Sequence, residues 1–458
     1  MRVIVCGAGQ VGFNIARYLA AEDNDVVVID TNAELVRRVG DTLDVQALQG
    51  YAAHPDVLDS AGANAAELII AVTYNDEVNM VACQVAHSLF NVPKKIARVR
   101  AQNYFAPDWA GLFTRDNMPI DVIISPEIEV ARAIMRRLEV PGAFDSTPMA
   151  DGKIRIIGVR CDANCPVLDT PLRQLVAIFP DLHIVVVAIV RNGAVLLPSG
   201  DDRMLAGDEV YFVADSTHVS RAMAAFGHEE LALRRVIIAG GGNIGLNFAQ
   251  ALESANTGVH SKIIEANRDR ATEIARLLKR TTVLNGSALD PEILEEANVG
   301  AAEAIVSVTN DDETNILSSL LAKRHGAGKA FTLVNNLNYA QLVSTLGVDA
   351  VVSPRLITVS TILQHVRRGR IRAVHPLSEG VGEILEVEAL ETCGLIGTPL
   401  RDAPLPNGVH IGALVRDGKV VMARGDTVIR PKDCVVLFAT TAAVKEAEKL
   451  FAVRLEFF

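Results

Sequence analysis

The residues of this sequence best suited to bind a ligand are glycines that interrupt two short apolar runs. The first copy is Gly7-Ala8-Gly9-Gln10-Val11-Gly12 and the second is Gly240-Gly241-Gly242-Asn243-Ile244-Gly245. In this spacing the missing Cβ atoms let backbone N–H groups approach a diphosphate at the start of a helix. One copy alone is weak evidence, but the duplication favours two dinucleotide-type sites.

A carboxylate follows each glycine loop at the end of the next predicted strand. Asp30 lies 23 positions after Gly7, where it can accept hydrogen bonds from both ribose hydroxyls and would repel a 2′-phosphate. Glu265 takes this place in the second copy, after a two-residue insertion. We therefore expect NAD(H) or an adenine nucleotide rather than NADP. The alternative is an ordinary strand-end carboxylate that caps the following turn.

Two polar side chains, Thr73 and Asn75, follow the fourth predicted strand. The carboxyl edge of a doubly wound sheet is where such folds bind ligands, so the Thr73 hydroxyl and the Asn75 amide are candidates to contact phosphate or ribose. The segment also reads as a helix start, with Asn75 or Asp76 as the N-cap. The two interpretations are compatible.

Two arginines mark the end of the fifth predicted strand. Arg98 and Arg100 lie at positions i and i+2, which places both on one face of a strand, where they could grip a di- or triphosphate. The alternative is a surface pair bound to neighbouring carboxylates. The counterparts in the second copy are Leu333 and Asn335, so that copy must hold phosphates without these charges.

The elements that would position these residues alternate between strand and helix. Apolar runs predict strands at 2–6, 26–29, 45–48, 68–72, 96–99 and 121–124, and apolar periodicity predicts helices near 10–21, 33–39, 55–61 and 76–89. Ser125-Pro126 should start a further helix that ends near Leu138 and closes this lobe. Helices between strands indicate a parallel sheet covered on both faces, that is, a doubly wound, Rossmann-like α/β fold.

The whole chain is a tandem duplication. After Pro141-Gly142, short strands between 154 and 213 and a helix near 216–226 predict a small α+β unit. Both the large and the small unit recur: for example, Thr170-Pro171-Leu172-Arg173 returns as Thr398-Pro399-Leu400-Arg401. We therefore expect four domains, at residues 1–142, 143–228, 232–372 and 373–458.

Composition narrows the class of protein. The 458 residues are 50% hydrophobic, yet the longest apolar run is only residues 184–190, so we expect no membrane-spanning helix. The first strand starts at Arg2 without a leader, which predicts a cytoplasmic protein. A net charge of −11 disfavours nucleic-acid partners. Of six cysteines only Cys161 and Cys165 are close, so we expect reduced thiols and no metal site.

The chain resembles the TrkA family, the cytoplasmic regulatory subunits of bacterial Trk potassium-uptake systems. The resemblance rests on the duplicated glycine loops, the strand-two acids, the small unit after each lobe and two motifs, Val72-Thr73-x-Asn75-Asp76-Glu77 and Gln49-Gly50-x-x-x-His54-Pro55-Asp56-Val57-Leu58. It covers essentially all residues and the domain order. It implies two tandem RCK modules, each a nucleotide-binding RCK_N domain followed by a small RCK_C domain.

This resemblance implies a nucleotide sensor rather than a catalyst. Members of the family form homotetrameric rings on a dimeric integral-membrane potassium transporter, bind NAD(H), ATP or ADP in the large lobes, and alter potassium flux. We therefore expect peripheral attachment to the inner face of the membrane. Exchange of ADP for ATP would recruit Arg98 and Arg100 to the extra phosphate and change the angle between lobes.

The resemblance also implies the residues of two sites. In the first lobe these are the glycine loop, Asp30, Gly50, Tyr51, Thr73 and Arg98, with Arg100 placed for a terminal phosphate. In the second they are its glycine loop, Glu265, Gly286, Ser287 and Thr309. We add the adjacent positions Thr31, Asn32, Tyr74, Asn75, Asn267 and Asn310.

The rival interpretation is an NAD-dependent oxidoreductase. It requires an acid/base group near the nicotinamide, and no tyrosine is followed four residues later by lysine. His54 precedes Pro55 at a predicted helix start, and His87 lies on an amphipathic helix, so neither is a convincing acid/base group. A third interpretation, a scaffold with vestigial sites, predicts no nucleotide affinity. We expect a protein that is not an enzyme.

Overall fold

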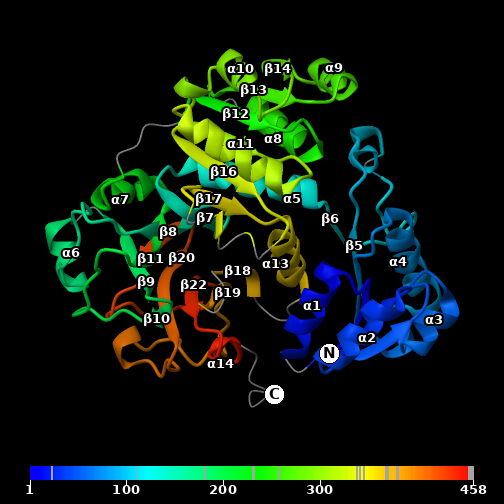
Figure 1. Cartoon of the computed structure of the whole chain (residues 1–458). Coiled ribbons are helices and arrows are strands. Elements are labelled where there is room, and N and C mark those ends of the chain that lie inside the picture. Colours follow the sequence, from blue (N-terminus) through cyan, green and yellow to red (C-terminus); the bar gives the residue numbers. More distant parts are fainter. Residues whose placement is uncertain are drawn as a thin grey trace. The chain divides into compact units, whose positions relative to one another are not determined.

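The computed structural model describes most of the chain. The described residues are 1–21, 24–109, 111–179, 182–228, 233–255, 258–336, 339, 342–343, 346–366, 371–377 and 381–451. They form four sheets in two compact units (Figure 1). The first unit contains lobe 1 (Met1–Met135) and lobe 2 (Arg234–Val366), and the second contains residues 136–233 and 367–458.

Lobe 1 is the predicted doubly wound fold. Its six-stranded parallel sheet has the order β3-β2-β1-β4-β5-β6. The strands are β1 (Arg2–Cys6), β2 (Asp25–Asp30), β3 (Gln46–Gln49), β4 (Leu68–Ala71), β5 (Lys94–Arg98) and β6 (Val122–Ile124). The α-helices are α1 (Gln10–Ala21), α2 (Ala33–Thr42), α3 (Pro55–Ser60), α4 (Asp76–Phe90) and α5 (Pro126–Glu139). The bounds differ from those predicted by a few residues.

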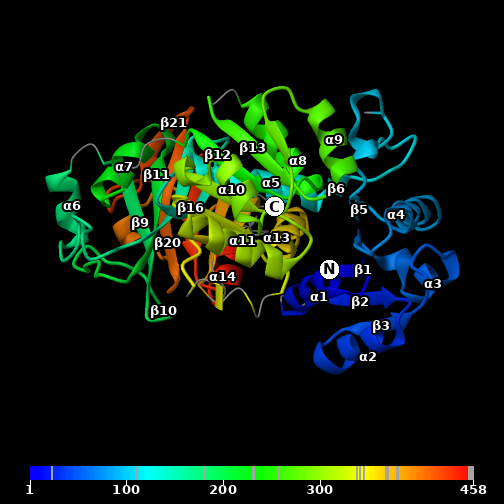
Figure 2. The same ribbon diagram turned by 45° about the horizontal axis from the view of Figure 1, so that its top comes forward.

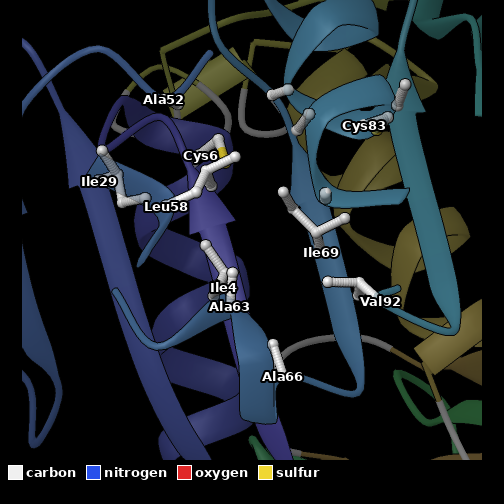
Figure 3. Close-up of a cluster of buried hydrophobic side chains, with 14 of the residues drawn as sticks. Ile4, Cys6, Ile29, Ala52, Leu58, Ala63, Ala66, Ile69, Cys83 and Val92 are labelled. Carbon is white, nitrogen blue, oxygen red and sulfur yellow. The ribbon is translucent and has the colours of Figure 1, made fainter. Parts of the chain in front are cut away.

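The central strands of lobe 1 are buried on both faces because helices cover each side. Ile4 and Cys6 pack into one core cluster, while Val3 and Val5 pack into another on the opposite face. This alternation follows from the two-residue repeat of a strand. Figure 3 shows the first cluster, in which Ile4 of β1 and Ile69 of β4 extend to the same side of the sheet.

Lobe 2 repeats this topology with the parallel order β14-β13-β12-β15-β16-β17. Its strands are β12 (Arg235–Ala239), β13 (His260–Glu265), β14 (Thr282–Asn285), β15 (Ala304–Ser307), β16 (Lys329–Leu333) and β17 (Ala350–Val352). Its α-helices include α8 (Asn243–Ser254), α9 (Arg268–Leu277), α10 (Pro291–Glu296), α11 (Asp312–Arg324) and α13 (Pro354–Val366). The duplication predicted from the sequence is therefore confirmed in the fold.

The two lobes share a core through α13. Four of its residues, Val359, Ile362, Leu363 and Val366, belong to the same buried cluster as Ile15 of α1 and the β1 side chains on that face. Figures 1 and 2 both show α13 beside α1. The prediction that α5 closes lobe 1 is wrong for this face, since α13 from lobe 2 packs there instead. The physical reason is that the apolar residues of α13 recur at 359, 362, 363 and 366, which forms one apolar stripe along the helix, and this stripe packs against α1.

The second unit holds the two small domains. Their sheets are antiparallel, with the orders β10-β9-β11-β8-β7 and β18-β19-β22-β20-β21. The first comprises β7 (Ala143–Met149), β8 (Ile154–Arg160), α6 (Leu172–Ile178), β9 (Ile184–Arg191), β10 (Ala194–Leu196), β11 (Glu209–Asp215) and α7 (Val219–Ala225). The second comprises β18 (Ile371–Pro376), β19 (Glu383–Glu388), β20 (Val409–Arg416), β21 (Lys419–Met422), β22 (Cys434–Ala439) and α14 (Val444–Leu450).

Matching ion pairs show that the small domains are copies of each other. Arg191 at the end of β9 contacts the buried Asp208 at 2.8 Å, and Arg416 at the end of β20 contacts the buried Asp433 at 2.7 Å. The two sheets also share one apolar cluster that includes Tyr211. The small α+β unit and its repetition are thus confirmed.

Two expectations from composition can be compared with the described residues. Within them, no helix combines the length and apolar character needed to cross a membrane, and no three His, Cys, Asp or Glu side chains gather as metal ligands would. All six cysteines are buried free thiols.

Candidate nucleotide-binding site

A cavity of about 680 Å³ lies in the first unit at the carboxyl edge of the lobe 1 sheet. This volume falls within the range of about 300–1,000 Å³ typical of small-molecule sites. The cavity brings together most of the predicted lobe 1 residues: Gly7, Gly9, Gln10, Val11, Asp30, Thr31, Gly50, Tyr51, Thr73, Tyr74, Asn75 and Arg98. Ala8, Gly12, Asn32 and Arg100 are not part of its lining.

Two glycines of the loop have different roles: Gly12 is required for packing, whereas Gly9 faces the cavity. A Cβ on Gly12 would lie 1.8 Å from the carbonyl oxygen of Gly7, so Gly12 allows α1 to start close to β1. A Cβ on Gly9 would meet nothing within 4 Å, although Gly9 lines the cavity. The open space at Gly9 is what a phosphate group at the start of α1 would require.

Asp30 serves the glycine loop as well as the cavity. Its Oδ2 accepts a hydrogen bond of 2.6 Å from the backbone N–H of Ala8, and its Oδ1 accepts one of 2.8 Å from the N–H of Asn32. As the alternative interpretation expected, Asp30 therefore caps the turn that follows β2. A carboxylate has about four acceptor positions, so two remain for the hydroxyls of a ribose.

The Asn32 side chain has a structural role of its own. Its Oδ1 accepts hydrogen bonds from the N–H groups of Glu34 and Leu35, which makes Asn32 the N-cap of α2. Asn75 likewise caps α4 by accepting from Val78 N–H at 3.0 Å, and it also lines the cavity. Both interpretations of Asn75 thus agree with its position.

Thr73 is held by a buried asparagine that the sequence analysis did not single out. Asn79 Oδ1 accepts hydrogen bonds from both the N–H and the hydroxyl of Thr73, at 2.8 and 2.7 Å. Asn79 Nδ2 donates to the carbonyl oxygens of Thr73 and Arg98. The Asn79 side chain therefore ties the end of β4 to the end of β5. Its signal in the sequence was the repeated spacing between Thr and Asn, which recurs at Thr309 and Asn315.

The two arginines occupy different environments. β5 ends at Arg98, so Arg100 lies beyond the strand. Arg98 lines the cavity, and its Nε is buried and has no hydrogen-bond partner among the described residues. Burial lowers the pKa of the Arg98 guanidinium, and the nearby charge of Arg100 lowers it further. A buried donor of this kind is suited to an anionic ligand.

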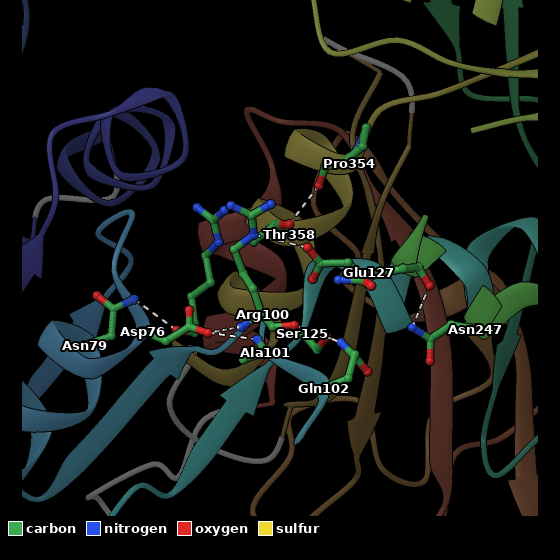
Figure 4. A network of polar contacts seen from close by, with 12 residues as sticks. Asp76, Asn79, Arg100, Ala101, Gln102, Ser125, Glu127, Asn247, Pro354 and Thr358 are labelled. Carbon is green, nitrogen blue, oxygen red and sulfur yellow. Dashed lines mark hydrogen bonds and ion pairs between the residues drawn. The ribbon is translucent and has the colours of Figure 1, made fainter. Parts of the chain in front are cut away.

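Arg100 is already bound to neighbouring side chains. Its Nε donates to Glu127 Oε1 at 3.1 Å (Figure 4). Its guanidinium lies 5.6 Å from the centre of the Tyr74 ring. The Tyr74 side chain is 85% exposed. The surface-pair alternative therefore describes Arg100 in this structure, whereas Arg98 points to the ligand cavity.

The remaining wall of the cavity includes residues that the sequence analysis did not predict for this site. Asn335, Pro354, Arg355 and Thr358 of lobe 2 line it together with the lobe 1 residues. Figure 4 shows Thr358 donating to the carbonyl oxygen of Pro354 in the first turn of α13. No local signal could have identified them, because their placement depends on the packing of α13 against α1.

Lobe 2 preserves the framework of the predicted second site. Glu265 Oε2 accepts a hydrogen bond of 2.7 Å from Gly241 N–H, and Glu265 Oε1 accepts one of 2.7 Å from Asn267 N–H. Asn267 caps α9, and Thr309 is held by Asn315 as Thr73 is by Asn79. Gly240 has a φ of 109°, close to the 111° of Gly7.

The other predicted lobe 2 residues continue this pattern. Gly286 N–H donates to the Glu265 carbonyl oxygen, and Ser287 Oγ accepts from Leu289 N–H. A Cβ on Gly242 would meet nothing within 4 Å, and Asn243 and Ile244 begin α8, which also contains Gly245. Asn310 takes the place of Tyr74, while the N-cap of α11 is Asp311.

One side chain distinguishes the glycine loop of lobe 2. Arg270 Nε donates to the carbonyl oxygen of Gly241 at 2.9 Å, and Arg270 also contacts Asn243 and Glu273. The corresponding position in lobe 1 is Leu35, which lines the cavity. Lobe 2 therefore places a positive charge beside its glycine loop, although it has no counterpart of Arg98.

Comparison with known proteins gives a family for the whole chain. The TrkA-N domain model matches residues 3–126 and 236–354, and the TrkA-C domain model matches residues 156–227 and 384–452. These matches coincide with the two lobes and the two small domains.

Curated relatives match along the full length. The Trk system potassium uptake protein TrkA of Azorhizobium caulinodans is 53% identical over 458 residues, with 100% of both chains covered. The protein of the same name from Halomonas elongata is 41% identical over 462 residues, again with 100% of both covered.

Solved structures support the fold. A GsuK channel aligns with 99% of this chain and 79% of its own at a TM-score of 0.63 and 18% identity, and a GsuK channel bound to NAD aligns with the same coverage at 0.60 and 17%. At this identity the likeness shows the fold alone. Taken with the full-length relatives and the tandem domain matches, the chain belongs to the TrkA family of Trk system potassium uptake proteins.

Proposed function

We propose that this chain is a nucleotide-sensing regulatory subunit that controls potassium flux through an integral-membrane Trk-type transporter. NAD(H), ATP or ADP binds in lobe 1, and the matching framework of lobe 2 forms a second site. The subunit acts as a homotetrameric ring on the cytoplasmic side of its membrane partner. The names of the relatives support a role in potassium uptake, and the NAD-bound channel of similar fold supports the ligand class.

The observation that carries this proposal is the pairing of opposite charges within one cavity. Asp30 offers acceptors beside the glycine loop. Arg98, at the end of β5, offers a buried donor that has no partner among the described residues. An adenine nucleotide has the matching pattern, with ribose hydroxyls that donate and phosphates that accept. The glycine loop, with the open space at Gly9, follows β1. In the sheet, β1 lies between β2, which ends at Asp30, and β5, which ends at Arg98.

Binding would act on the transporter by changing the arrangement of the lobes. A ligand shifts such an equilibrium only by its different affinity for the two states. In this mechanism, exchange of ADP for ATP draws Arg98 and Arg100 toward the added phosphate. Arg100 must then exchange its contact with Glu127 for the ligand.

Isothermal titration of the full-length chain with NADH, NAD, ATP and ADP tests the proposal. We expect saturable binding, weakened by Arg98→Gln and unaffected by Arg37→Gln, because Arg37 is an exposed residue of α2 outside the cavity. Arg100→Ala should reduce the preference for ATP over ADP, and an unchanged preference would remove Arg100 from the mechanism. Absence of binding to the wild-type chain would reject nucleotide sensing, and turnover of NADH would favour an enzyme.

A further inference from the structure

The lobe 1 cavity is completed by a helix from lobe 2. α13 begins at Pro354, and its second residue, Arg355, lines the cavity with Arg98. Farther along the same helix, Ile362 and Leu363 are anchored in the lobe 1 core. The backbone that carries Arg355 is therefore fixed relative to lobe 1 by apolar packing.

Neither cavity arginine forms an ion pair with a described residue, although the charges of Glu127 and Asp76 act on Arg98. In the part of the chain that the structure describes, no carboxylate lies within ion-pair distance of the Arg98 or Arg355 guanidinium. Asp312, whose charge acts on Arg355, already accepts hydrogen bonds from the N–H groups of Asn335 and Asn336. Two partly desolvated guanidinium groups on one cavity favour an anion between them.

The acidic and the basic residues of the cavity lie at the ends of different strands of the sheet. Asp30 is the only acidic residue of the described lining, and it ends β2, whereas Arg98 ends β5. In the sheet order, β1 and β4 separate these strands, which places the strand ends roughly 14 Å apart at about 4.8 Å per strand. A nucleotide whose ribose lies at Asp30 and whose α-phosphate lies at the glycine loop therefore extends its later phosphates toward Arg98 and Arg355.

We propose that Arg355 is a specificity-determining residue of the lobe 1 site, which donates hydrogen bonds to the terminal phosphate of a bound nucleoside di- or triphosphate. This inference rests on the proposed nucleotide binding in lobe 1. The terminal phosphate then links the two lobes, since Arg98 belongs to lobe 1 and Arg355 to lobe 2. A longer phosphate chain makes a stronger link.

Lobe 1 has no arginine at the position that corresponds to Arg355. Ser125-Pro126 corresponds to Ser353-Pro354, so Glu127 is the counterpart of Arg355. Glu127 carries the opposite charge and is bound to Arg100. The duplication thus has an acid at one copy of this helix start and, at the other, an arginine that forms no ion pair with a described residue.

The test compares the affinities of the full-length chain for ATP, ADP and adenosine by isothermal titration. Arg355→Gln should raise the Kd for ATP about tenfold to hundredfold, the range expected for loss of hydrogen bonds to a charged group, and leave adenosine binding unchanged. Arg355→Lys should recover part of the ATP affinity because it keeps the charge. Arg37→Gln, which removes an exposed arginine of lobe 1, should behave as wild type.

The outcomes separate this inference from the proposed function. A wild-type chain that binds none of the three ligands and neither NADH nor NAD rejects nucleotide sensing itself. A wild-type chain that binds NADH but neither ATP nor ADP overturns the role of Arg355 alone. A wild-type chain that binds ATP, with unchanged ATP affinity in Arg355→Gln, overturns the role of Arg355 alone. Equal weakening of ATP and adenosine would also overturn it, since it would indicate a structural effect. A thermal melt of each variant shows whether it is folded.

Discussion

The carboxylate of Asp30 accepts a hydrogen bond of 2.6 Å from the backbone N–H of Ala8, inside the glycine loop. Lobe 2 makes the same contact between Glu265 and Gly241 at 2.7 Å. The strand-two acid therefore holds the loop that would receive the phosphates while it offers its remaining lone pairs to the ribose. One residue couples the two halves of the predicted ligand.

Replacement of this acid should weaken nucleotide binding. We expect Asp30→Asn to raise the Kd for NADH about tenfold or more, because an amide accepts fewer hydrogen bonds and carries no charge. The same change should narrow the discrimination against NADPH, since the repulsion of a 2′-phosphate is removed. Titration calorimetry with both ligands measures the two effects. Asp41→Asn, at an exposed position of α2, is the control, and equal effects from both variants would contradict the assignment.

The glycine loop allows structure and binding to be tested separately. Gly12→Ala should lower the free energy of unfolding by about 3 kcal/mol or more, because its Cβ would meet the Gly7 carbonyl oxygen at 1.8 Å. Gly9→Ala should change it by no more than about 0.5 kcal/mol, yet weaken nucleotide binding, because its methyl group enters the cavity. Urea titrations at one protein concentration and calorimetry give both quantities. Normal nucleotide affinity in Gly9→Ala would place the phosphates elsewhere.

The shared core of the lobes predicts a difference between two positions on α13. Ile362 is fully buried in the lobe 1 cluster, so Ile362→Ala should cost about 2–5 kcal/mol of unfolding free energy. Leu356 on the same helix is 50% exposed, and Leu356→Ala should cost no more than about 0.5 kcal/mol. Urea denaturation of the intact chain makes the comparison. Similar costs for both variants would mean that α13 does not pack on lobe 1.

Acid stability should depend on Glu253 at the end of α8. Burial alone would raise the pKa of this carboxyl, but hydrogen bonds from the N–H groups of Arg280, Lys279 and Thr281 outweigh it and lower the pKa from 4.5 to about 2. A lowered pKa in the folded state means that the ionised carboxylate stabilises the fold. This contribution is complete above about pH 4.5 and is lost as the pH falls toward 2.

The measurement is the difference in melting temperature between wild type and Glu253→Gln across this pH range. The difference should be largest near neutral pH and shrink below about pH 4.5, because the protonated carboxyl resembles the amide. The exposed Glu295→Gln on α10 provides the matched control, since it removes one carboxylate from the same lobe. A difference that stays constant down to about pH 3 would contradict this role of Glu253.

Much of the lobe 1 site was predictable because it depends on local sequence. The spacing from Gly7 to Asp30 spans one turn, one helix and one strand, and each of these elements has a periodic apolar pattern. The carboxyl ends of parallel strands meet at one edge, so Asp30, Thr73 and Arg98 were expected to converge, and all three line the cavity. The role of Asn79 could also have been predicted, because the sequence repeats this residue as Asn315.

The environment of Arg100 could not be predicted from the local sequence. Positions i and i+2 share a face only while the strand continues, and β5 ends at Arg98. Beyond that point the side chain takes its place from Glu127 and Tyr74, which lie on α5 and before α4. The role of Arg270 could not be predicted either, because an arginine in a helical sequence pattern gives no sign that it contacts the Gly241 carbonyl oxygen.

By itself, the sequence determined that the protein is a duplicated chain of doubly wound lobes and small antiparallel domains, with a glycine loop and an acid in each lobe. Only the tertiary structure decided that α13 of lobe 2 packs beside α1 and that Arg355 lines the cavity of lobe 1. The physical reason is the distance along the chain over which each kind of interaction acts. Turns, caps and strand periodicity act over a few residues, whereas the choice of helix that covers α1 depends on the fit of apolar surfaces more than 300 residues apart in the chain.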